Sequence, residues 1–317
     1  MSALIAAEEL SKRFPLGGLF SRGRAVQAVT DFSVAIAKGE AVGLVGESGS
    51  GKSTVGRLML GLLPASAGRV LFEGADLAVA KVETLRVLRQ RMQLVFQDPY
   101  GSLDPRRKIG AQIGDGLAIH GLIARRERAG RVAELLEQVG LAREHAERYP
   151  HQFSGGQRQR IGIARALATG PEFLVADEPV SALDVSVQAQ VLALLADLRG
   201  RLGLAMLFIS HDLPVVRHLC DRVVVMYLGR VMEEGPVSAV FSSPRHPYTQ
   251  ALLSSAPSLL PERRRTRVLL QGEPPSPANP PSGCVFRTRC PIAVVACGEA
   301  VPAFRGENGH RVACIRA

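Results

Sequence analysis

The sequence predicts an α/β fold, because short apolar runs alternate along it with amphipathic helical patterns. The run 173–176 has the length and composition of a buried strand, and 185–202 has the spacing of a long helix with one apolar side. A further apolar run, 204–209, follows that helix. At 317 residues the chain is long enough for a main domain with a large core and an appended piece.

Composition and charge exclude several classes of protein. The net charge of +10 comes mostly from Arg scattered along the chain, without a basic stripe interleaved with aromatics, so we expect no nucleic-acid partner. No apolar run approaches the roughly 18 to 20 residues of a membrane-spanning helix. The first residues contain Glu8 and Glu9, where a signal peptide would be basic. We therefore expect a cytosolic chain that forms no channel itself.

The N-terminal part alternates apolar and polar residues over 5–14 and 25–36, which predicts two edge strands separated by a glycine-rich stretch. Phe14 and Phe20 stand where an aromatic ring could stack on a nucleotide base. Ordinary packing is the alternative for both rings.

A glycine-rich loop follows the next apolar strand, 41–45, and precedes a helical pattern that begins near Ser53 and ends before Pro64. Residues 46–54 match the phosphate-binding pattern G-x-x-x-x-G-K-S/T. Backbone N–H groups of such a loop converge on a phosphate, Lys52 reaches its outer oxygens, and Ser53 offers a hydroxyl to Mg²⁺. A flexible turn that happens to contain a lysine fits this strand–loop–helix context less well.

Strand, helix and strand are then predicted at 69–72, 81–91 and 92–96, and a polar hinge follows at Gln97. From Asp98 to about Gln152 the pattern is helical and polar, with helices expected over 109–119 and 125–139, so we expect a helical insert. Ser154-Gly155-Gly156-Gln157 opens the next helix. This cluster is either a second anion site or an ordinary Ser N-cap with flexible glycines.

Two carboxylates, Asp177 and Glu178, follow the strand that ends at Ala176, on the sheet edge where α/β proteins bind ligands. Asp177 suits the Mg²⁺ side of a phosphate site, and Glu178 could polarise an attacking water. His211 follows strand 204–209 at what we expect to be the same edge. Further strands are predicted at 222–227 and 230–234, and the core is expected to end near Phe241.

The C-terminal part is rich in proline and is expected to be a loop-rich appendage with little core of its own. It contains four of the five cysteines, namely Cys284, Cys290, Cys297 and Cys314. Metal ligation is the leading functional interpretation, by an iron–sulfur cluster or, less readily at this wide spacing, by Zn²⁺. Unliganded thiols are the alternative, and the isolated Cys220 is expected to be a buried apolar residue.

Taken together, these motifs resemble the ATP-binding subunit of an ABC transporter over residues 1 to about 245. The resemblance implies that Gly46–Thr54, including Ser48, Gly49, Gly51 and Thr54, is the Walker A loop and that 173–177 is Walker B. It makes Glu178 the catalytic carboxylate, Gln97 the Q-loop glutamine on Mg²⁺ and water, and His211 the switch histidine. It also implies that Ser154–Gln157 is the signature motif, Ser181–Asp184 the D-loop, and Phe14 the base-stacking aromatic. The signature usually begins with Leu where this chain has Phe153, a conservative exchange.

More narrowly, Phe96–Pro99, Ser102–Arg106, His246–Thr249 and the cysteine-rich tail are similar to the oligopeptide/dipeptide importer branch, some of whose members carry a 4Fe–4S cluster in that tail. Met226–Gly229 is similar to the second of the two ATPase subunits that such importers often have. The resemblance implies as partners a homologous ATPase, two membrane permease subunits and an extracytoplasmic peptide-binding protein. It places the chain on the cytoplasmic face of the membrane.

The fold class implied is therefore a P-loop ATPase core with an antiparallel β subdomain, a helical insert and a loop-rich, cysteine-containing extension. We expect the core over 1–97 and 161–245, the insert over 98–160 and the extension over 246–317. The family works as a head-to-tail dimer in which the signature motif of one subunit covers the ATP of the other. A soluble ABC ATPase unrelated to transport, or an importer of nickel or glutathione, are the alternatives.

Overall fold

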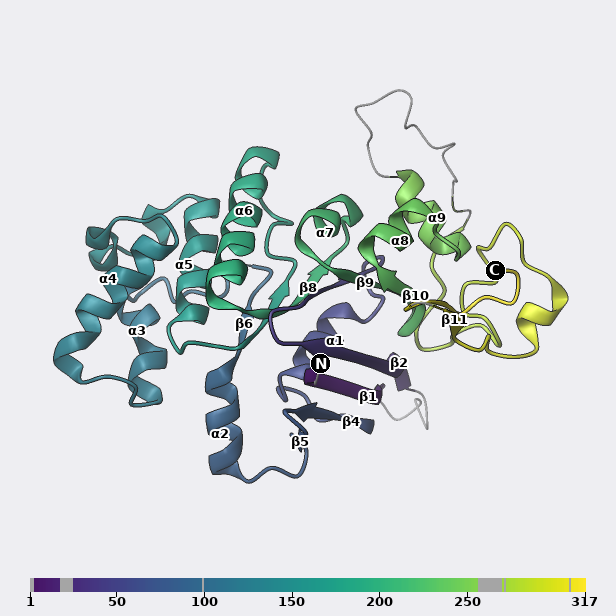
Figure 1. Cartoon of the computed structure of the whole chain (residues 1–317), viewed down its shortest axis with the longest axis horizontal. Helices are drawn as coiled ribbons and strands as arrows, with labels where there is room; N and C mark the ends of the chain where they lie inside the picture. The colour runs from purple at the N-terminus through teal and green to yellow at the C-terminus, as the bar shows by residue number, and fades with distance from the viewer. Residues whose placement is uncertain (1–2, 18–24, 99, 256–269, 271, 308) are drawn as a thin grey trace. The chain divides into compact units, whose positions relative to one another are not determined.

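The computed structural model describes residues 3–17, 25–98, 100–255, 270, 272–307 and 309–317. The chain divides into two compact units. The first comprises Phe72–Phe208 with Met1–Ile5 and Ile36–Glu40, and the second comprises Ala6–Ala35, Ala41–Leu71 and Ile209–Ala317. Figure 1 labels most of the helices and strands of both units, with the chain coloured from purple at the N-terminus to yellow at the C-terminus. Phe20 lies outside the described residues.

Three neighbouring strands underlie the first unit, in the order β8 (Ala205–Ser210), β7 (Phe173–Asp177) and β6 (Met92–Val95). β6 and β7 run parallel, with Met92 opposite Phe173. All residues of β7 and β8 are buried. This burial explains their uninterrupted apolar sequences, because a parallel sheet is covered on both faces. The strands predicted for these three segments are confirmed to within one residue at each end.

The helices of the first unit begin and end close to the predicted positions. They are α2 (Val82–Arg91), α3 (Ile109–Ile119), α4 (Arg128–Gln138), α5 (Gly155–Leu167) and α6 (Val185–Leu202), with short 3₁₀ turns η1 (Arg125–Glu127), η2 (Arg143–Glu147) and η3 (Pro150–Gln152). The helix predicted over 125–139 thus starts as the turn η1. Figure 1 shows α3, α4 and α5 grouped together. Their buried residues are mostly apolar, such as Ile113, Leu136 and Ile161. α6 ends at Gly203, whose φ of 63° gives the left-handed C-cap that glycine favours.

In the second unit, β3 (Ala41–Val45) runs parallel to β9 (Arg222–Tyr227), which pairs antiparallel with β10 (Arg230–Pro236). Its helices include α1 (Lys52–Met59), α7 (Leu213–Leu219) and α8 (Val237–Ser242). α7 packs so closely on β3 that a Cβ added to Gly43 would lie 2.3 Å from Val216 Cγ1. Cys220 is buried after α7, as predicted.

The predicted N-terminal strands form a separate four-stranded sheet in the order β2–β1–β4–β5. Their bounds are β1 (Ala3–Pro15), β2 (Ala25–Ala37), β4 (Ala67–Phe72) and β5 (Ala75–Asp76). Alternate side chains of β2, including Phe32, Val34 and Ile36, are buried. This alternation is what a sheet with one covered face requires.

The C-terminal extension is mostly irregular, as expected, but it continues the fold of the second unit. It contains α9 (Pro247–Ser255), η5 (Val295–Gly298), β11 (Arg305–Glu307) and β12 (His310–Val312). β12 pairs antiparallel with β10, with Val312 opposite Glu233. Phe286 is fully buried against Tyr227 of β9 and Tyr248 of α9, with ring centroids 5.3 Å apart in both pairs. Packing around β9 therefore does not end near Phe241 but includes the extension.

Candidate functional site

The predicted phosphate loop joins β3 to α1 within the second unit. Lys52, the first residue of α1, is only 4% exposed. Its ammonium donates to the carbonyl oxygens of Gly46, at 2.8 Å, and Glu47, at 2.9 Å. Two carbonyl oxygens of its own loop thus hold the buried ammonium. A phosphate oxygen carries formal charge and would be a stronger acceptor for the same ammonium.

Backbone geometry restricts this loop to glycine at two positions. A Cβ on Gly46 would lie 2.1 Å from the carbonyl oxygen of Met226, and one on Gly51 would lie 2.1 Å from that of Ala28. Gly51 is the N-cap of α1 with φ 101°, and no side chain caps the helix or places an acid in its first turn. The N-terminal end of α1 is therefore suited to an anion brought from outside the chain.

In the first unit, the structure brings together two of the predicted catalytic residues, one after β6 and the other after β7. Gln97 Nε2 donates to Glu178 Oε2 at 2.9 Å. Glu178 has a φ of 44°, a left-handed conformation that is uncommon for a residue other than glycine. Asp177, at the end of β7, is buried. The left-handed backbone of Glu178 is strained in a way that is often found at functional sites.

The predicted signature motif opens α5 with a complete capping box. Ser154 Oγ accepts from the N–H of Gln157 at 3.4 Å, and Gln157 Oε1 accepts from the N–H of Ser154 at 3.0 Å. Of the two interpretations, the ordinary N-cap is thus realised in this structure. Gly156 lies against α6, because a Cβ there would lie 2.3 Å from Val187 Cγ1.

Asp184, the last residue of the predicted D-loop, is the N-cap of α6. Its Oδ1 accepts from Ser186 Oγ at 2.7 Å and from the N–H of Val187 at 3.0 Å. The hydrogen bond from Ser186, followed by that from Val187, lowers the pKa of Asp184. Asp184, which the sequence assigns to a nucleotide site, is therefore also the N-cap of α6, the helix that packs on Gly156.

His211 and Phe14 are both exposed in the second unit. His211 lies between β8 and α7, and burial raises the pKa of its neighbour Asp212. Phe14 is near the end of β1 and 37% exposed, with the Lys12 ammonium 5.2 Å from its ring centroid. Gln97 and Glu178 belong to the first unit, whereas Lys52, His211 and Phe14 belong to the second.

The four C-terminal cysteines line one small cavity, together with His246 and Phe286. Cys297 and Cys314 are buried and Cys284 and Cys290 are half-buried. Burial raises the pKa of the Cys284 and Cys290 thiols. Convergence of four thiols is the donor set that an iron–sulfur cluster or Zn²⁺ requires.

The size of this cavity argues against the expected cluster. Its volume of about 10 Å³ gives room for about one water molecule. Moreover, no group of three or more His, Cys, Asp or Glu in the described part of the chain is arranged to hold a metal ion. The 4Fe–4S cluster expected from the sequence therefore does not fit the cavity in this conformation.

Sequence reasoning missed the residues that hold Glu47 of the phosphate loop. The N–H of Glu47 donates to Tyr248 Oη at 2.8 Å, and its Oε2 accepts from Arg289 Nη1 at 2.7 Å. These partners lie 201 and 242 residues further along the chain. No local sequence pattern indicates that Tyr248 and Arg289 contact Glu47. The only sequence signals near them are the His246–Thr249 motif, which includes Tyr248, and Cys290, which follows Arg289.

Among the described residues, no helix is both long enough and apolar enough to cross a membrane.

Two families match the chain in consecutive parts. Residues 29–181 match the family described as "ABC transporter", and residues 232–297 match "Oligopeptide/dipeptide transporter, C-terminal region". The second match includes Cys284, Cys290 and Cys297.

Relatives cover almost the whole chain. A peptide import ATP-binding protein of Brucella ovis is 54% identical over 314 residues, which are 99% of this chain and 98% of that protein. The dipeptide transport ATP-binding protein DppF of Escherichia coli is 47% identical over 313 residues, covering 98% of this chain and 94% of its own. A solved dimeric structure of the ATP-binding cassette MJ0796, in a post-hydrolysis state with ADP and Pi, is 28% identical at a TM-score of 0.66 and covers 74% of this chain and 98% of that one. The chain therefore belongs to the ABC transporter family, as an ATPase subunit of its oligopeptide/dipeptide branch.

Proposed function

We propose that this chain hydrolyses ATP to drive the import of dipeptides or oligopeptides. The observation that carries the proposal is the loop before α1, where a buried lysine faces carbonyl oxygens of its own loop and no side chain caps the helix. That geometry suits a polyphosphate. The peptide substrate is supported by the names of the relatives and by the C-terminal family match.

In this proposal the phosphate loop binds the β- and γ-phosphates of ATP. Lys52 exchanges the carbonyls of Gly46 and Glu47 for phosphate oxygens, and backbone N–H groups of the loop donate to the same anion. Ser53, Asp177 and Gln97 are the residues that would supply oxygen ligands to Mg²⁺. Phe14 stacks on the base. The loop residues proposed to contact nucleotide are Gly46, Ser48, Gly49, Gly51, Lys52, Ser53 and Thr54.

Glu178 is proposed to orient and polarise the water that attacks the γ-phosphate, with Gln97 and His211 assisting. The hydrogen bond from Gln97 to Glu178 supports this assignment, because it holds the carboxylate in one orientation.

We propose further that two ATPase chains form a head-to-tail dimer. Ser154, Gly155, Gly156 and Gln157, with Asp184, would then contact the nucleotide bound by the other subunit. Support comes from the dimeric cassette among the similar structures. In this structure the Ser154 hydroxyl accepts from the N–H of Gln157 at 3.4 Å, a long hydrogen bond. Contact between this hydroxyl and a phosphate would either replace that hydrogen bond or be made in addition to it.

The proposed assembly pairs this chain with a second, homologous ATPase on two permease subunits at the cytoplasmic face of the membrane. An extracytoplasmic peptide-binding protein would deliver the substrate, and no nucleic acid takes part. The domain bounds that we propose remain 1–97 with 161–245 for the core, 98–160 for the helical insert and 246–317 for the extension.

The four thiols of the extension are proposed to bind a 4Fe–4S cluster rather than Zn²⁺. Support comes from the convergence of Cys284, Cys290, Cys297 and Cys314 on one cavity. Because that cavity holds only about one water, the thiols would have to move apart on binding. The half-buried Cys284 and Cys290 are the thiols with more room to do so.

The decisive experiment purifies the chain with its membrane partners and measures ATP-dependent uptake of labelled dipeptides and longer peptides into vesicles. Peptide uptake that needs ATP and is lost with Lys52→Ala supports the proposal. Uptake of nickel or glutathione but not of peptides would show that the importer has a different substrate. ATP hydrolysis without permease partners would indicate a soluble ATPase.

A further inference from the structure

Every polar backbone and side-chain group of Glu47 is engaged, although this residue is one of the unspecified positions of the phosphate loop. Its carbonyl oxygen accepts from Lys52 Nζ and from the N–H of Ser50, at 2.9 and 3.2 Å. Its N–H and carboxylate contact Tyr248 and Arg289. One residue therefore links the nucleotide-binding lysine to two side chains of the C-terminal extension, all within the second unit.

The contact with Arg289 is largely removed from water. The Arg289 side chain is 8% exposed and that of Glu47 is 27% exposed. Arg289 Nη1 also donates to Tyr227 Oη at 3.3 Å. Burial alone would lower the pKa of Arg289, but its hydrogen bonds to Glu47 and Tyr227 raise it overall. Removing one partner of such a pair would leave the other charge buried and uncompensated.

A rigid aromatic cluster holds both partners in place. Tyr227, Tyr248 and Phe286 are buried and pack edge-on or tilted, with the rings of Tyr227 and Tyr248 4.8 Å apart. The N–H of Arg289 donates to the carbonyl of Phe286 at 3.0 Å, so the guanidinium is carried by a turn anchored in this cluster. Such side chains have little freedom to drift away from Glu47.

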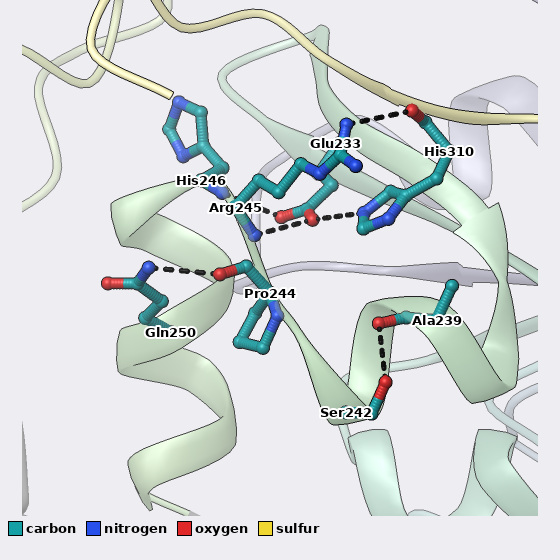
Figure 2. A network of polar contacts seen from close by, with 8 residues as sticks. All are labelled: Glu233, Ala239, Ser242, Pro244, Arg245, His246, Gln250 and His310. Carbon is teal, nitrogen blue, oxygen red and sulfur yellow. Dashed lines mark hydrogen bonds and ion pairs between the residues drawn. The ribbon is translucent and has the colours of Figure 1, made fainter. Parts of the chain in front are cut away.

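The chain segment that precedes Tyr248 is held by the buried carboxylate of Glu233 (Figure 2). Glu233 accepts from the N–H groups of Arg245 and His246, at 2.8 and 2.9 Å, and lies 2.7 Å from His310 Nε2. His246 Nδ1 in turn accepts from the N–H of Tyr248 at 3.1 Å. The chain segment that enters α9 is thus tied to β10 and β12, which holds the backbone that carries Tyr248.

We propose that Arg289 and Tyr248 are positioning residues for nucleotide binding: by holding Glu47, they keep the phosphate loop in the conformation in which its N–H groups and Lys52 converge on a phosphate. The extension is then part of the nucleotide site. Arg289 directly precedes Cys290, one of the four cysteines that line the small cavity. This inference rests on the proposed role of Gly46–Thr54.

The test measures ATP affinity of the full chain and its thermal stability without nucleotide. Arg289→Met is expected to weaken ATP binding about tenfold, and Glu47→Gln by a similar factor, with no further loss in the double variant, because the two residues act as one unit. Arg287→Gln is the matched control. Its guanidinium lies in the same turn but donates to Ser282, so ATP affinity should stay at the wild-type value.

A merely structural role predicts a different result. If Arg289→Met lowered the unfolding temperature but bound ATP as tightly as the wild type, the inference would be overturned. Should that variant not fold, Tyr248→Phe removes only the hydroxyl and is expected to weaken ATP binding several-fold, and unchanged affinity would equally overturn the inference. Failure of both wild type and Arg287→Gln to bind ATP would instead contradict the proposed function.

Discussion

Gln97 and Glu178, 81 residues apart in the chain, form a hydrogen bond of 2.9 Å at neighbouring strand ends in the first unit. The amide arrives on the loop after β6 and the carboxylate on the residue after β7, so the parallel pairing of these two strands produces the contact. This contact gives the catalytic assignment a geometric basis.

Glu178→Gln is expected to retain ATP binding and to lower ATP turnover by about 10²–10⁴-fold, the range that a positioned general base contributes. Phosphate release and ATP affinity should be measured together, since the expected loss is in the rate alone. Glu144→Gln, an exposed carboxylate in η2, serves as the control. Turnover at the wild-type rate in Glu178→Gln would exclude the catalytic role.

Lys52→Ala is expected to weaken ATP binding at least about thirtyfold, because truncating a buried charged partner costs about 2–5 kcal/mol. Equilibrium binding of a fluorescent ATP analogue checks this. Lys81→Ala removes an exposed lysine at the start of α2 and should leave the affinity unchanged. Equal affinities in the two variants would contradict the phosphate-loop assignment.

Gly156→Ala is expected to destabilise the fold by about 1–3 kcal/mol, the usual cost of overpacking, because its Cβ would lie 2.3 Å from Val187 Cγ1. Gly162→Ala is the matched substitution in the same helix, where a Cβ would meet nothing within 4 Å. It should stabilise the fold by about 0.5–1 kcal/mol. Urea unfolding of both variants measures the difference, and equal stabilities would refute the close packing of α5 on α6.

Acid is expected to destabilise the protein through His246. Burial lowers the pKa of this side chain from 6.5 to about 4. The unfolded chain therefore takes up a proton on this residue below about pH 6.5, whereas the folded chain does not until about pH 4. Stability should fall as the pH drops through this window, by an amount on the order of 3 kcal/mol.

In the folded chain His246 Nδ1 accepts from the N–H of Tyr248, and protonation of this nitrogen would break that hydrogen bond. Unfolding in urea between pH 4.5 and 7 should show the slope in the wild type and a smaller slope in His246→Asn. A slope that is unaffected by the substitution would show that other groups cause it.

Protein purified without oxygen is expected to be brown and to contain iron, and removing the iron with a chelator should bleach it. Replacing the half-buried Cys290 by Ser should lower the iron content, whereas Cys220→Ser, outside the thiol cavity, should not. A colourless preparation that contains zinc would indicate a single Zn²⁺ ion in the cavity. A preparation without any metal would show that the four cysteines bind no metal.

Some features of the structure could be predicted from the sequence because they are local. The helix α6 and the strand β9 begin and end where their periodicity predicts, since each pattern lies within one segment. The short strands β11 and β12 were not predicted. Three residues carry too little periodicity, and β12 exists because it pairs with β10.

The same distinction applies to the candidate site. The sequence alone determined the phosphate loop, the two carboxylates at the end of β7 and the four C-terminal cysteines, because glycine spacing, a strand end and thiol side chains are visible in consecutive residues. Only the tertiary structure decided that Arg289 and Tyr248 hold Glu47, and that the four thiols line one narrow cavity. Those contacts join segments more than 200 residues apart, or depend on how a loop folds, and neither leaves a local pattern.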